Sequence, residues 1–118
     1  MIFIGINQAI DAEKNVVFCH NVEAIKKTSA GDLVVMNYNE DDLPFYARCE
    51  IAIAVKIETI EQFMYLGATR AKYTICAFDL AIEAQKLADH YLLDIKVLAI
   101  SRDVEQVALA GIDGIFHA

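Results

Sequence analysis

Residues 51–77 have the sequence IAIAVKIETIEQFMYLGATRAKYTICA, in which two apolar runs flank one amphipathic segment. The runs at 51–55 and 73–77 are almost continuously apolar, which is typical of strands buried on both faces of a parallel sheet. Between them, the apolar residues of 58–66 are spaced as on one face of a helix. This stretch is therefore a strand–helix–strand unit, and it decides the fold class.

The same unit recurs along the chain. We expect further strands over 16–19, 33–36, 95–100 and 112–116, and further helices over 22–30, 41–48, 80–92 and 103–110. The sequence therefore predicts one α/β domain over residues 1–118, with a three-layer, Rossmann-like or flavodoxin-like open sheet. That sheet is mostly parallel, with about six strands and helices on both faces. The first apolar stretch, 2–6, either joins this sheet in parallel or forms a hairpin with 16–19.

The composition is unusually apolar for a chain of this length. Of the 118 residues, 57% are hydrophobic, compared with roughly 45–50% in soluble domains. A sheet buried on both faces accounts for part of this excess. Because small domains leave much surface uncovered, we also expect apolar surface to be buried against a second copy, as in a homo-oligomer.

No apolar run approaches the roughly 20 residues needed to span a bilayer, so no membrane association is expected. Residues 1–6 lack the basic region and the cleavage site of a signal peptide, and we interpret them as a strand. Cys19, Cys49 and Cys76 are odd in number and far apart. This spacing favours free thiols in the reducing cytoplasm over a disulfide framework or a zinc site.

Two classes of binding site are disfavoured. A net charge of −7 argues against a nucleic-acid surface, because affinity for phosphate backbones comes mainly from clustered Lys and Arg. Gly31, Gly67 and Gly111 each follow a predicted helix, where a left-handed residue often ends the helix. Phosphate-binding loops need glycines at the opposite turn, from strand to helix, so no dinucleotide, P-loop nucleotide or other cofactor is predicted.

Ligands of open parallel sheets bind outside the carboxyl ends of the strands. Many of the polar residues that the sequence places there are accounted for as helix N-caps, namely Asn21, Asn39, Asp79 and Asp103. The candidate ligand-binding residues that we select at this edge are Lys56, Arg102, His20, Asp79 and His117.

Lys56 and Arg102 are the two cations of that set. Lys56 would pair with a phosphate or carboxylate, or serve as an amine nucleophile if desolvated; its structural alternative is an ion pair with Glu58. Arg102 would hold an anion through two hydrogen bonds, or remain a solvated loop residue. Together they suggest a small anionic ligand.

Catalytic and metal sites are not predicted. Adjacent strand residues point to opposite faces, so Cys19 and His20 do not form a nucleophile–base pair. Cys19 and Cys76 lie within apolar runs and are expected in the core. Metal binding by His20, His117 and Asp79 would require their strand ends to converge, and the spacing of metal motifs is absent.

Three segments resemble parts of a phosphate-binding βα barrel: AVKIETIE at 54–61, LGA at 66–68 and AGIDGIF at 110–116. The resemblance extends over residues 51–118. The chain is much shorter than the roughly 200 residues of small barrels, so two incomplete barrels would have to assemble to complete the comparison.

These observations lead to one functional hypothesis and two alternatives. The leading hypothesis is a cytoplasmic α/β domain that binds a ligand or another protein as a regulatory module. The first alternative is an enzyme that acts on a phosphorylated or carboxylated small molecule at the carboxyl edge of the sheet, using Lys56. The second is a structural subunit of a larger complex.

Overall fold

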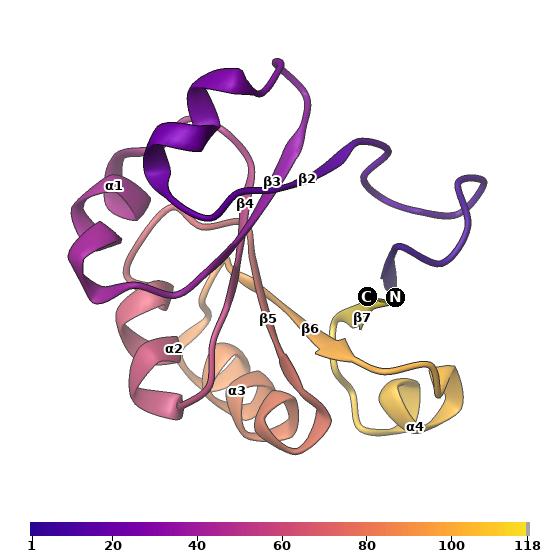
Figure 1. Ribbon diagram of the computed structural model, residues 1–118. Helices are drawn as coiled ribbons and strands as arrows, with labels where there is room; N and C mark the ends of the chain where they lie inside the picture. Colours follow the sequence, from indigo (N-terminus) through magenta and orange to yellow (C-terminus); the bar gives the residue numbers. More distant parts are fainter. Residues whose placement is uncertain (118) are drawn as a thin grey trace.

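Seven strands form one entirely parallel sheet in the order β1-β7-β6-β5-β4-β3-β2. The computed structural model describes residues 1–117 (Figure 1); Ala118, the last residue of the predicted domain, lies outside the described residues. The strands are β1 (Ile2–Ile4), β2 (Val16–Phe18), β3 (Leu33–Asn37), β4 (Ile53–Lys56), β5 (Tyr73–Ala77), β6 (Lys96–Ile100) and β7 (Gly114–Phe116).

From β2 to β7, each strand pairs with the next one along the chain. Such right-handed crossovers place all connecting helices on the same side of the sheet, and Figure 1 shows them around its convex face. They are the 3₁₀ segments η1 (Val22–Lys27) and η2 (Glu40–Asp42) and the helices α1 (Leu43–Arg48), α2 (Ile60–Gly67), α3 (Phe78–Tyr91) and α4 (Val104–Leu109).

The predicted class, a single domain with an open parallel α/β sheet, is confirmed. Two details differ. The sheet has seven strands instead of about six, because the stretch at 2–6 contributes β1. The helices gather on one face of the sheet because the strand order never reverses direction; we expected helices on both faces. The sheet is curled, and its helix-free face is concave (Figure 1).

Side chains alternate between two cores, as the period of a strand requires. The outer core lies between the sheet and the helices and includes Phe63 and Leu66 of α2, Val55 and Val97. The inner core fills the concave side. Its buried members are Ile4, Leu33, Val35, Ala54, Tyr73, Ile75, Leu98 and Phe116. The strands read as continuous apolar runs because both of their faces are covered.

The N-terminal segment joins the sheet in parallel, so the hairpin alternative is not realised. β1 pairs with β7, with Ile2 opposite Gly114 and Ile4 opposite Phe116. A side chain at position 114 would place its Cβ 2.3 Å from the carbonyl oxygen of Ile2. Glycine therefore permits the close approach of β1 to β7.

The connection from β1 to β2 crosses the open side of the sheet. At its far end, Glu13 accepts hydrogen bonds from the Lys72 ammonium and the Tyr73 hydroxyl. Tyr73 belongs to the inner core, so this contact gives its hydroxyl a partner at the amino end of the curl.

Several helix boundaries differ from those expected. The segment 22–30 is only a short 3₁₀ turn, and α3 begins at Phe78, directly after β5. Gly31 and Gly111 have positive φ, but Gly67 is the last residue of α2 without it, and the left-handed residue that ends α3 is Leu92. Within residues 1–117, no helix is long and apolar enough to cross a membrane.

Candidate functional site

A cavity of about 230 Å³ opens at the carboxyl ends of the strands, inside the curl of the sheet. Residues of every strand except β1, and of the turn after β2, line it. The lining residues are Phe18, Cys19, His20, Val35, Met36, Asn37, Lys56, Ile75, Ile100 and Phe116. This is the edge at which parallel α/β sheets bind their ligands, and it contains the predicted residues His20 and Lys56.

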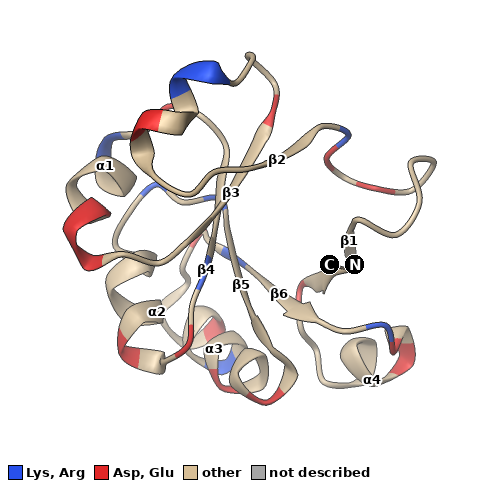
Figure 2. Cartoon of the chain, viewed as in Figure 1, with Lys and Arg blue, Asp and Glu red and all other residues tan. Residues whose placement is uncertain are grey.

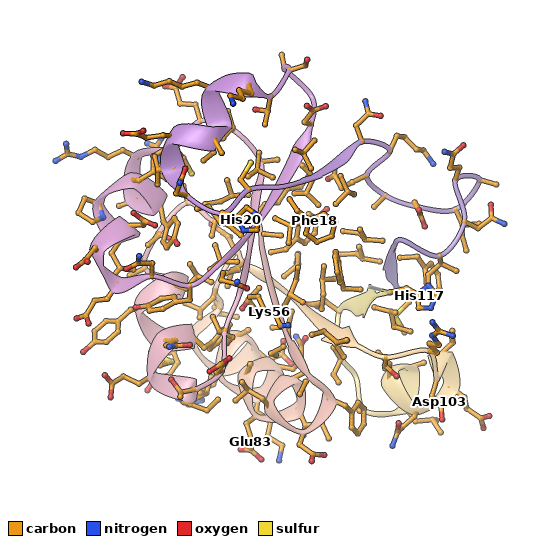
Figure 3. The ribbon with its side chains drawn as sticks, in the orientation of Figure 1. Phe18, His20, Lys56, Glu83, Asp103 and His117 are labelled. Atoms are coloured by element: carbon orange, nitrogen blue, oxygen red, sulfur yellow. The ribbon has the colours of Figure 1, made fainter. Side chains whose placement is uncertain are left out.

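The strand period places an amide and an ammonium side by side in this cavity. Val35 and Ala54 belong to the inner core, so Asn37 and Lys56, each two residues further along, point to the same concave face. The two residues are direct partners in the register of β3 and β4, on strands about 4.8 Å apart. Lys56 and His20, both labelled in Figure 3, line this cavity.

The cavity has cationic and polar groups but no acidic ones among the described residues. Its lining includes Lys56 and His20 and no carboxylate, although the chain has 17 acidic residues and only 10 Lys and Arg. Figure 2 shows most acidic positions on the helices and loops outside the sheet. The local charge at the cavity is therefore opposite to that of the whole protein.

Lys56 has neither an ion pair nor a side-chain hydrogen bond with any residue in 1–117. The alternative of an ion pair with Glu58 is not realised. The ion pair found among residues 1–117 joins Lys72 to Glu13. Lys56 is exposed at the end of β4, so its ammonium is accessible to an anion and has no carboxylate partner among the described residues to compete with it.

A second, smaller cavity of about 110 Å³ lies next to the first. It is lined by Ile100, Ser101, Arg102, Phe116 and His117, so Ile100 and Phe116 line both cavities. The structure thus divides four of the predicted site residues into two pairs, each with one cation and one histidine. His20 and Lys56 line the larger cavity, and Arg102 and His117 line the smaller one.

His117 is held in one orientation by the backbone. Its Nδ1 lies 3.1 Å from the carbonyl oxygen of Gly5. Because a carbonyl oxygen only accepts, Nδ1 must donate the proton of this hydrogen bond. Its other ring nitrogen, Nε2, is buried and has no hydrogen-bond partner among the described residues.

Asp79 lines neither cavity; it is exposed in the first turn of α3. Its predicted N-cap role is wrong, because α3 follows β5 so closely that Ala77 occupies the N-cap position. The other three predicted caps are confirmed: Asn21, Asn39 and Asp103 accept hydrogen bonds from backbone N–H groups of η1, η2 and α4.

The cysteines behave as core residues. Cys19, Cys49 and Cys76 are free and buried, and burial raises the pKa of the Cys76 thiol to about 12. Among residues 1–117 no group of three or more His, Cys, Asp and Glu side chains is placed to hold a metal ion.

Sequence reasoning did not select the residues that shape the larger cavity. Asn37 and the apolar walls formed by Phe18, Ile75, Ile100 and Phe116 were not among the predicted site residues. The sequence signal available for them is alternation: residues of one strand that lie an even number of positions from an inner-core residue share its face.

No protein family, curated protein or solved structure matches this chain in the three comparisons made.

Proposed function

We propose that this domain binds a small anionic molecule, carrying a phosphate or a carboxylate, in the cavity at the carboxyl end of the sheet. One observation carries the proposal. Lys56 lines the cavity, beside Asn37 and His20, without a carboxylate partner within the described chain. A lysine ammonium binds phosphate and carboxylate as a point charge, and the neighbouring amide supplies hydrogen bonds to the same oxygens.

The cavity also limits the size and chemistry of the ligand. Its volume of about 230 Å³ is below the roughly 300–1,000 Å³ of pockets for drug-sized ligands, so the ligand is a small metabolite. Phe18, Ile75, Ile100 and Phe116 would contact its carbon skeleton, while Lys56 would hold its charged group. This division of apolar walls and few polar groups is typical of small-molecule sites.

Thermal unfolding with phosphorylated and carboxylated metabolites tests the proposal, because a ligand of the native state raises its stability. Compounds that stabilise the wild-type protein should bind roughly 10- to 100-fold more weakly to Lys56→Gln, since a hydrogen bond to a charged group contributes about 1.5–3 kcal/mol. The matched control is Lys86→Gln, which removes the same charge from the exposed side of α3. Equal binding by Lys56→Gln and the control would contradict the proposal.

Catalysis on the same class of compounds is the second candidate function. It is favoured by one observation: His20, an acid–base side chain, lines the same cavity as the amine of Lys56. Incubating each stabilising compound with the protein and following it by NMR distinguishes the two. Unchanged compound supports a binding module, and conversion that Lys56→Gln abolishes supports an enzyme.

We further propose that the protein works in the cytoplasm as a homo-oligomer. Three buried free thiols support a reducing compartment. Exposed large apolar side chains support contact with a second copy, among them Tyr91 and Leu92 at the end of α3 and Leu109 at the end of α4. Native mass spectrometry at micromolar concentration tests this, and a monomer alone would contradict it.

A further inference from the structure

We infer that the ligand carries two acidic groups, one held by Lys56 in the larger cavity and one held by Arg102 and His117 in the smaller cavity. This inference rests on the proposed function, because it takes the larger cavity as the first half of the site. It adds a second recognition point and thereby specifies the class of ligand: a short diacid or a phosphorylated carboxylic acid.

The first step is that both cavities lie on one apolar surface. Ile100 of β6 and Phe116 of β7 are partners in the sheet register, and both residues line both cavities. The polar groups differ between the cavities, with Lys56, Asn37 and His20 lining one and Ser101, Arg102 and His117 lining the other. A molecule that crosses the pair needs an apolar middle and two polar ends.

The second step is that the smaller cavity is cationic. Arg102 is exposed and has no ion pair with any residue between 1 and 117. The carboxylate of the neighbouring Asp103 accepts a hydrogen bond from the backbone amide of Gln106, 3.0 Å away. The Arg102 guanidinium thus has its five donors available for a carboxylate or a phosphate, which it binds through two parallel hydrogen bonds.

The third step concerns His117, whose ring is fixed before any ligand binds. Gly5 accepts the Nδ1 proton of His117, and the Gly5 amide donates to the Asp11 carboxylate over 3.2 Å. Gly5 has φ of +84°, and a Cβ there would lie 2.4 Å from the carbonyl oxygen of His117. With Nδ1 so engaged, Nε2 is the atom left to bind a ligand, and in the protonated ring it donates to an anion.

Calorimetric titration with matched pairs of acids tests the inference. The probes are unbranched α,ω-dicarboxylates and ω-phosphocarboxylates of three to six carbons, each compared with the monoacid of the same chain length. For the pairs that bind, we expect the diacid to bind the wild-type protein at least about tenfold more tightly than the monoacid. This ratio should fall to near one in Arg102→Gln and to an intermediate value in His117→Phe, while Lys56→Gln weakens both members of each pair.

The control is Arg48→Gln, which removes an equal charge from the end of α1, and thermal midpoints verify that each variant is folded. A monoacid affinity that depends on Lys56, without preference for any diacid, would overturn this inference and leave the proposed function standing. A preference that Arg102→Gln does not change would also overturn it. Absence of binding by every acid, or binding indifferent to Lys56, would overturn the proposed function and this inference together.

Discussion

Phe18 of β2 and Phe116 of β7 meet edge to face, with ring centroids 6.3 Å apart and planes at 76°. In the strand order, β2 is one edge of the sheet and β7 lies next to the other edge. The contact therefore bridges the two ends of the curled sheet on the side where β1 and β2 do not pair. It also forms part of the rim of the larger cavity, which both rings line.

The two rings of this contact should contribute unequally to stability. Phe116 is 4% exposed and belongs to the inner core, whereas Phe18 is 67% exposed. We expect Phe116→Ala to lower the free energy of unfolding by about 3–5 kcal/mol. Phe18→Ala should lower it by only about 0.5–1.5 kcal/mol, the contribution of an aromatic pair. Urea unfolding of both variants measures this, and equal losses would show that the curl does not bury Phe116 as described.

Gly114 should be intolerant of even a methyl group. The Cβ of Gly114→Ala would lie 2.3 Å from the Ile2 carbonyl oxygen and 2.8 Å from Cδ2 of Leu98. Because the nearer atom is backbone, β1 must shift, and we expect a loss of about 1–3 kcal/mol or more with faster amide exchange in β1.

Gly67→Ala is the matched control for this variant. Its Cβ would meet only side-chain atoms of Leu93, the nearest being Cδ1 at 2.9 Å, the end of a flexible side chain that can move away, and φ is not positive there. Since alanine also favours the helix by up to about 1 kcal/mol, this variant should be neutral or more stable. If both variants cost the same, the close approach of β1 to β7 is not what requires glycine at 114.

The strands were predictable because their signal is local. The run at 73–77 matches β5 residue for residue; it consists of five apolar or β-branched residues that follow the polar Lys72. The strand order was not predictable from the same runs. A strand with helices on both faces and a strand between an outer and an inner core are buried on both faces alike, so their sequences look the same.

The residues of the candidate site were likewise predictable only in part. Placing Lys56, His20, Arg102 and His117 at the carboxyl edge required only the strand boundaries. Recognising Asn37 beside Lys56, or the wall of Ile100 and Phe116, required knowing which face is concave, and the curl decides that. Asp79 illustrates the other difficulty, because its role depended on where the helix begins: α3 starts at Phe78, two residues before the predicted start at 80, and carries Asp79 within it.

Cys76 should be the least reactive of the three thiols. It is 0% exposed, compared with 7% for Cys19 and 8% for Cys49, and burial raises its pKa to about 12. Since the thiolate is the nucleophile, iodoacetamide at pH 8 should leave Cys76 unmodified in the native protein and modify it in urea. Peptide mass spectrometry follows each site. Modification of Cys76 as fast as that of Cys19 and Cys49 in the native protein would contradict its place in the outer core.

The loop that positions His117 should open in acid. Asp11 accepts hydrogen bonds from the backbone amides of Asn7, Ile6 and Gly5; that from Asn7 contributes most, and together they hold the pKa of Asp11 below its usual 3.8. Because the folded pKa is lower than the unfolded one, this stabilisation is fully present above about pH 4 and is lost as the pH falls through the folded pKa.

NMR measures this directly, through the amide shifts of Gly5 and Asn7 and the imidazole signals of His117 between pH 7 and pH 2. In the wild-type protein the amides should change with the protonation of Asp11. In Asp11→Asn they should differ from the wild type already at pH 7 and show no such step, whereas Asp41→Asn, an exposed carboxylate of η2, should behave as wild type. The His117 signals should shift with the Gly5 amide, because the Gly5 peptide links the carboxylate to the imidazole. Imidazole chemical shifts of His117 that are the same in Asp11→Asn as in the wild type would show that the carboxylate does not position the ring.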